Sequence, residues 1–327
     1  MKKIIFFVTF AAMSYTSYSQ SLGYEDLSTM FSRNDRNGSA RFVAMGGAFG
    51  AVGGDVTAMT INPAGISIFN DSNASIAFQS RSTDYLTTYY GNSTTTQQDF
   101  FKVSNAGVVF TFNNYTSDEW SKLAMGINYR VLADFEDTFI AKGTSGFASF
   151  DNFPLDNSEN PLVYDIADNQ QLSNFYNGDM SELSFAFSGV YEEKMHVGAG
   201  LNFYDLNFSQ QTILRENNND GNNNTLNARL YQENFTTGVG FSLSAGVIYK
   251  PTNAFRLGLS YQSPTWFTEI IENTNITNND GFFGDTEIEV SNDDMVYDNT
   301  FGGNLPTQGL LYKLRTPSKI TASTAII

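Results

Sequence analysis

Apolar and polar residues alternate along much of this chain. Between residues 238 and 249, an apolar row runs from Val239 through Phe241 and Leu243 to Tyr249, and glycine and serine fill the first positions between them. The same period of two recurs at 121–132, 181–191, 195–208 and 254–263. Successive side chains of a strand point to opposite faces of a sheet, so the pattern predicts strands with one apolar and one polar face.

A soluble sandwich also produces a period of two, but two features favour a transmembrane β-barrel. The strand cores are about 10 residues long, which matches a tilted strand crossing a hydrocarbon layer. Their apolar face carries no charged residue, as expected where a charge would contact lipid. We predict strands at 73–82, 103–113, 121–132, 181–191, 195–208, 235–249, 254–263, 308–315 and 319–327.

The spacing of these strands predicts their orientation. Short turns are expected at 192–194, 251–253 and 316–318, and long polar loops at 84–101, 134–180, 209–235 and 264–306. In outer-membrane barrels the short turns face the periplasm. The nine predicted strands form an odd set that ends in mid-strand at Ile327, whereas single-chain bacterial barrels have even numbers. We therefore expect the chain to be a fragment that lacks about five strands.

The N-terminus has the order of a secretory signal peptide. Lys2 and Lys3 precede a short apolar core, and Ser17 and Ser19 supply small residues before Gln20. That core is too short to span a bilayer. We expect residues 1–19 to be removed and the protein to reach the outer membrane of a diderm bacterium.

A glycine-dense apolar stretch at 38–66 separates the signal from the strands. It is too irregular for a barrel strand and too apolar for a free linker. We interpret residues 20–71 as a partly helical hatch that plugs the lumen, and residues 72–327 as a partial barrel wall.

Composition excludes several classes of function. With 0 Cys there is neither a disulfide nor a thiolate metal site, and the net charge of −16 argues against nucleic acid as a partner. No Ser-His-Asp arrangement can be recognised, so we do not expect an enzyme. His196 is the only histidine, and we predict no metal or other cofactor.

The order of motifs resembles the FadL family of outer-membrane long-chain fatty acid and hydrocarbon transporters, which includes the toluene-transport group. The resemblance rests on a glycine-rich plug, the segment Gly54–Ala58, then Asn62-Pro63-Ala64-Gly65 and an outward strand. It implies a fourteen-stranded barrel when complete, with the Asn-Pro-Ala motif in the hatch. The family's third strand is kinked to open the wall toward lipid, and by order this maps to 121–132, where Gly126 is the candidate.

Transport of a fatty acid requires an apolar pocket, because burying twelve methylenes is worth roughly 10 kcal/mol. Its candidate lining is the set of apolar hatch residues, for each of which packing of the plug against the wall is the more common role: Phe42, Val43, Met45, Phe49, Val52, Met59 and Ile61. Arg130 and Arg256 lie on the polar faces of strands and are candidates to meet the carboxylate, or to form interior salt bridges.

The sequence thus predicts passive uptake of a hydrophobic small molecule by a monomer in outer-membrane lipid, gated by the hatch. The alternative is a surface receptor or adhesin, for example for haem, that acts through its long external loops. The plug discriminates between them, because an adhesin does not require one.

Overall fold

The computed structural model describes residues 24–33, 35–113, 119–153, 162–252, 254–275, 285–290, 296–298 and 307–327. The expected signal peptide lies outside these residues. The chain divides into two compact units, residues 1–33 and 34–327. The first contributes the helix α2 (Tyr24–Phe31). The second contains the sheet and the remaining helices, and it carries every feature discussed below.

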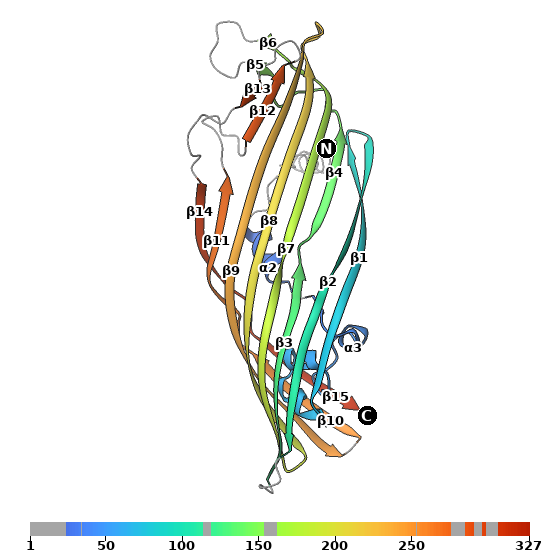
Figure 1. Ribbon diagram of the computed structural model, residues 1–327, viewed down its shortest axis with the longest axis vertical. Coiled ribbons are helices and arrows are strands. Elements are labelled where there is room, and N and C mark those ends of the chain that lie inside the picture. Colours follow the sequence, from blue (N-terminus) through green and yellow to red (C-terminus); the bar gives the residue numbers. More distant parts are fainter. Residues whose placement is uncertain are drawn as a thin grey trace, which may run out of the picture. The chain divides into compact units, whose positions relative to one another are not determined.

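A curled antiparallel sheet dominates the second unit (Figure 1). Its strands follow the order β1-β2-β3-β7-β8-β9-β10-β15. Their bounds are β1 (Asn73–Tyr89), β2 (Asn92–Asn113), β3 (Trp120–Asp134), β7 (Ile166–Tyr191), β8 (Met195–Asn219), β9 (Thr225–Thr252), β10 (Phe255–Gln262) and β15 (Lys319–Ile326). Each of the nine predicted strands overlaps a strand of this sheet. The antiparallel β-sheet class is therefore confirmed, whereas a closed barrel of fourteen strands stays a prediction.

The last part of the wall differs from the prediction. After Pro264, β11 (Trp266–Asn275) continues along the same partner as β10, since both pair with β9. In the same way β14 (Thr307–Arg315) pairs with β11, and β15 pairs with β10. The segment 316–318 therefore interrupts one continuous line of strand opposite 263–265, which we call an in-line break, and it is not a turn. The interruption is explained by Pro264 and Pro317, whose nitrogens cannot donate a hydrogen bond to the ladder. The prediction of nine separate wall strands was wrong. The argument that the chain is a fragment because its number of strands is odd was therefore wrong as well.

The long polar loops were also predicted wrongly over most of their length. β1 and β2 form one continuous hairpin whose pairing reaches Tyr89 and Asn92. β8 and β9 pair without a register shift from Met195 with Tyr249 to Asn219 with Thr225. These extensions are mostly polar, apart from a small apolar cluster that includes Leu214, Leu226 and Leu230, so the regular apolar alternation disappears. Backbone hydrogen bonds do not depend on that alternation. Their threonine and tyrosine content suits a strand.

Short strands occupy the same far region. They are β4 (Asp137–Gly143), β5 (Asn152–Phe153), β6 (Leu162–Val163), β12 (Asp285–Val290) and β13 (Val296–Asp298). β4 pairs with β7, β5 with β6, and β12 with β13 and β9. The 134–180 and 264–306 segments thus contain strands that the sequence pattern did not reveal.

The apolar row of each strand lies on the outer face of the curled sheet. On β9, Val239, Leu243 and Tyr249 are exposed by 59%, 52% and 46%. Their sequence neighbours Ser242 and Ile248 are fully buried on the inner face. A row of large apolar side chains facing outward is the opposite of a soluble sandwich, in which such a face would be covered.

Residues 38–69, which we call the helical segment, lie on the inner face. They hold α3 (Ala40–Ala44), η2 (Val56–Thr60) and η3 (Pro63–Ile68), and no strand. Val56, Met59 and Ile66 pack against Val109, Ala124 and Ala186 of the wall. One hydrophobic core of the unit therefore forms between this segment and the sheet, and another gathers around Tyr164 and Leu226 in the far region.

Candidate functional site

The Asn-Pro-Ala-Gly motif joins the helical segment to the wall. Asn62 is fully buried, and its Oδ1 accepts a hydrogen bond from Ala64 N at 3.1 Å, which caps η3. Its Nδ2 donates to Gly50 O at 2.8 Å and to Val247 O of β9 at 3.3 Å. Pro63 occupies the first helical turn, where its missing N–H has no cost. The motif is therefore both a helix cap and a tether to the sheet.

The Gly54–Ala58 motif contains a second helix cap. Asp55 caps η2 through a hydrogen bond from Thr57 N to its Oδ1 at 2.9 Å. Its other oxygen accepts from Ser39 Oγ at 2.7 Å, and Ser39 in turn caps α3 by accepting from Phe42 N. The two helices begin from one hydrogen-bonded pair of caps. Loss of such a cap typically costs about 1 kcal/mol.

Glycines on the inner face allow the helical segment to approach the wall closely. A Cβ at Gly198 would lie 2.5 Å from Ala64 N, and one at Gly246 would lie 2.0 Å from Asn62 Oδ1. Comparable contacts, of 2.3–2.5 Å, involve Gly107, Gly126 and Gly258. These five glycines come from five different strands. The glycine positions of the alternating pattern therefore form a surface that fits the segment.

The seven candidate lining residues do not form one group. Phe42 and Phe49 are buried and stack with ring centroids 5.5 Å apart, and Val52 and Ile61 pack against their cluster. The remaining three lie elsewhere: Met59 packs against the wall, whereas Val43 and Met45 are 49% and 42% exposed. None of the seven lines the cavity described below, and their role in binding a ligand stays a prediction.

Arg130 forms a buried ion pair. Its Nε and Nη2 donate to Glu182 Oε2 at 3.0 and 2.6 Å, and the two side chains are only 4% and 1% exposed. Glu182 also accepts from Ser184 Oγ at 2.8 Å. A carboxylate of the protein itself thus meets this guanidinium, which is the structural alternative that the sequence left open for Arg130.

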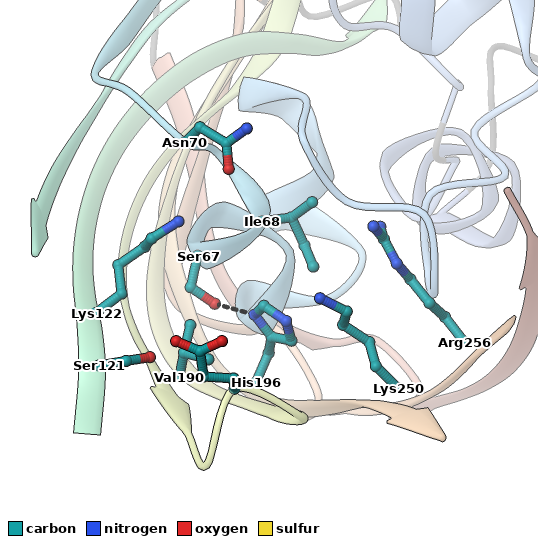
Figure 2. A pocket seen from close by; sticks show the side chains of 10 residues that line it. Ser67, Ile68, Asn70, Ser121, Lys122, Val190, His196, Lys250 and Arg256 are labelled. Carbon is teal, nitrogen blue, oxygen red and sulfur yellow. Dashed lines mark hydrogen bonds between the residues drawn. The ribbon is translucent and has the colours of Figure 1, made fainter. Parts of the chain in front are cut away.

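Arg256 lies in a different environment. Its Nη1 donates to Val52 O of the helical segment at 2.7 Å, and its buried Nε has no hydrogen-bond partner among the described residues. Arg256 lines a cavity of about 410 Å³ near the 192–194 turn (Figure 2). The other lining residues are Ser67, Ile68, Asn70, Ser121, Lys122, Val190, Glu193, His196, Lys250.

Sequence reasoning did not select Lys122, Lys250 or His196 for this cavity. The alternation contained this information. Each of the three residues is an even number of positions from a glycine that faces inward on the same strand, so its side chain points to the same inner face. Each also lies near a strand end at the same edge of the sheet. Combining parity with distance from the nearest turn would have placed them on one face at one edge of the sheet, although not at contact distance.

The predicted kink at Gly126 is not visible in the strand pairing. Gly126 pairs with Val109 of β2 and with Ala186 of β7, and the register of β3 shifts instead between Val131 and Ala133. Beyond that shift β2 no longer pairs with β3, since their ladder ends at Asn105 and Arg130.

Side chains bridge the wall above this point. Lys102 Nζ of β2 lies 3.1 Å from Asp134 Oδ1, and Thr96 Oγ1 accepts from Ile140 N of β4 at 3.1 Å. Tyr85 also donates to Asp137. The edges of β2 and β4 are thus joined by side chains and not by a ladder, and we call this boundary the seam.

Among the described residues no helix is long and apolar enough to cross a membrane, and no group of three or more His, Cys, Asp or Glu side chains could hold a metal ion. Comparisons with models of known families, with curated proteins and with solved structures found no match to this chain.

Proposed function

We propose that this protein takes up hydrophobic compounds, foremost long-chain fatty acids, across the outer membrane, with the helical segment as its hatch. One observation carries the proposal: a tethered, partly helical segment lies on the inner face of a sheet whose outer face is apolar. A receptor needs only the sheet. A segment on the inner face is useful in a protein that controls the passage of a molecule along the inside of the wall.

The outward apolar rows support a membrane location. Lipid is the environment in which exposed valine, leucine and phenylalanine on every second position are stable, and antiparallel strands satisfy the backbone there. The resemblance to the FadL family adds the substrate class. The two motifs that carry it, around Asp55 and Asn62, are the caps that shape the segment.

The tethers define what gating requires. Asn62 bonds Val247 O, Arg256 bonds Val52 O, and Ser260 Oγ donates to Ile61 O at 2.7 Å. These bonds hold the segment against β9 and β10, so a substrate passes only if part of the segment shifts. The wall opens most easily at the seam, toward its far half, because separating β2 from β4 breaks no ladder.

Uptake of labelled oleate and of a labelled neutral hydrocarbon tests the proposal, in cells that lack their own transporter and express the full-length protein. We expect uptake of oleate above the level of cells without the protein. Absence of uptake of both compounds, with the protein correctly inserted, would refute it.

Replacing Asn62 by Ala should alter that uptake. The change removes the cap of η3 and both tethers of Asn62 Nδ2, and we expect a loss of about 1–2 kcal/mol in local stability. Oleate uptake should slow while the wall stays folded, as judged by heat-modifiable migration. Asn73, which is exposed at the start of β1 and lies outside the cavity lining, provides the matched control: Asn73→Ala should leave uptake unchanged.

One observation favours the receptor alternative. β7, β8 and β9 are 26, 25 and 28 residues long. Even at a tilt of 45° such strands rise about 60 Å, twice the thickness of a hydrocarbon core. The wall therefore extends well beyond a membrane and presents a large polar surface. Binding of haem to intact cells, without any uptake of oleate, would support this alternative.

A further inference from the structure

The cavity near the 192–194 turn carries an unusual concentration of positive charge. Lys122, Lys250 and Arg256 come from three strands and line it together, and Glu193 is the one carboxylate in the lining. The whole chain has 18 Lys and Arg residues and a net charge of −16. Composition alone therefore does not explain why three of these cations lie in one cavity.

None of the three cations forms an ion pair within the described part of the chain, since no carboxylate lies within 4.0 Å of their nitrogens. Lys122 Nζ donates to the backbone at Phe69 O, at 2.9 Å, and Arg256 donates to Val52 O. Neither partner carries a charge. Lys250 Nζ has no side-chain hydrogen bond among the described residues. Arg130 is different, because Glu182 neutralises it.

His196 supplies a second, independent sign of an absent ligand. Its side chain is buried, with 4% exposure, and its Nδ1 is 2.8 Å from Ser67 Oγ. Its Nε2 is buried and has no partner in the described structure. Figure 2 shows the imidazole between Ser67 and the end of Lys250. A buried polar atom without a partner is costly unless something occupies the site.

We propose that this cavity binds the oxyanion head group of an amphiphile, namely a carboxylate, at the edge of the wall where the helical segment ends. A carboxylate accepts charge-assisted hydrogen bonds and would relieve the mutual repulsion of the three cations. Ser67 belongs to the helical segment and Lys122 donates to its Phe69 O, and both line the cavity, so an occupant lies next to the part that must shift. The choice of an amphiphile rests on the proposed transport function, whereas the oxyanion site does not.

The test compares three probes on the full-length protein purified in neutral detergent: decanoate, decanol and inorganic phosphate. The variant is Lys250→Gln, because that ammonium group holds no other part of the structure. The control is Lys194→Gln, which removes the same charge from the adjacent turn, at an exposed residue outside the cavity lining.

We expect Lys250→Gln to weaken decanoate binding about tenfold. Decanol binding should change by less than about twofold, and Lys194→Gln should alter neither probe by more than that. Without any variant, added salt should weaken decanoate binding and leave decanol binding unaffected.

Three outcomes would overturn the proposal. Equal weakening of decanoate and decanol would show that Lys250 acts through the fold. Phosphate binding as tight as decanoate binding, with the same dependence on Lys250, would assign the cavity to a free oxyanion. Unchanged decanoate binding in Lys250→Gln would show that this cavity does not bind the carboxylate.

The result is separable from the transport proposal. Oleate uptake by cells together with unchanged decanoate binding in Lys250→Gln would leave transport standing without this site. Binding that depends on Lys250, in a protein that transports neither compound, would leave the site standing without transport.

Discussion

The two halves of the long strands share one backbone ladder but differ in the side chains that cover their faces. In the half next to the 192–194 turn, the outer face is apolar and the inner face is covered by the helical segment. In the far half, beyond about residue 208 of β8, most side chains on both faces are polar, and a smaller apolar cluster packs around Tyr164 and Leu226. Gln211 Nε2 donates to Glu233 Oε1 at 2.9 Å there, and Thr212 Oγ1 donates to Asn174 Oδ1 at 2.6 Å.

The difference shows that apolar alternation reports the surroundings of a strand and not the existence of the strand. The pairing of β8 with β9 passes from one half to the other without a shift. The near half is stabilised by burial against the segment, and the far half by the ladder, by cross-strand polar pairs and by the smaller apolar cluster around Tyr164 and Leu226. Substitutions should therefore cost much more in the near half than in the far half.

The largest expected effect is at the buried ion pair. Glu182→Gln leaves the Arg130 guanidinium buried without a counter-charge, and we expect a loss of about 3–5 kcal/mol in the free energy of unfolding. Glu233→Gln is the matched change in the far half, where the carboxylate is half-buried and accepts from Gln211. It should cost less than about 1 kcal/mol. Unfolding in urea measures both, and equal losses would contradict the comparison.

The next effect is at the close contact between the segment and the wall. In Gly198→Val the new side chain would overlap the backbone of Pro63 and Ala64, which are 2.5 Å from the position of its Cβ. We expect a loss of about 1–3 kcal/mol, or release of the segment. Protease accessibility of residues 38–69 distinguishes the two results.

The control for this contact is Ala199→Val on the same strand, because residue 199 is exposed on the outer face. It should change stability by no more than about 0.5 kcal/mol. A similar loss in both variants would mean that the segment does not depend on the glycine surface.

The smallest effect is at the tip of the far half. Asp220 accepts hydrogen bonds from Asn222 N and from Asn224 N and Nδ2, and the Asn224 side chain is the main cause that lowers the pKa of Asp220 below its ordinary value. A lowered folded pKa stabilises the tip above the unfolded pKa, and this contribution is lost as pH falls through the folded value.

Asp220→Asn should therefore lower the melting temperature slightly at pH 7, and the difference from the unchanged protein should shrink at pH 3. Melting curves at the two pH values measure this. A difference that grows toward low pH would contradict the sign of the shift.

Local chemistry made much of the near half predictable. The alternation located the wall strands there except β11, which fell within the predicted 264–306 loop. Asn62 before Pro63 indicated a stiff turn, because proline restricts the residue that precedes it. The far half was missed, because threonine- and asparagine-rich ribbons have no apolar period and resemble loops. The in-line break at 316–318 was misread as a turn, since Pro317 marks both equally well.

The order of residues along the chain was enough to specify strand faces, helix caps and the glycine-rich inner surface, since each depends on neighbours a few positions away. Which distant groups meet was a matter of the folded arrangement. Glu182 lies 52 positions from Arg130 and neutralises it, whereas Arg256 finds no carboxylate. The cavity with Lys122, His196 and Lys250 likewise exists because strand curling and the docked segment bring their ends together, and no local pattern encodes that distance.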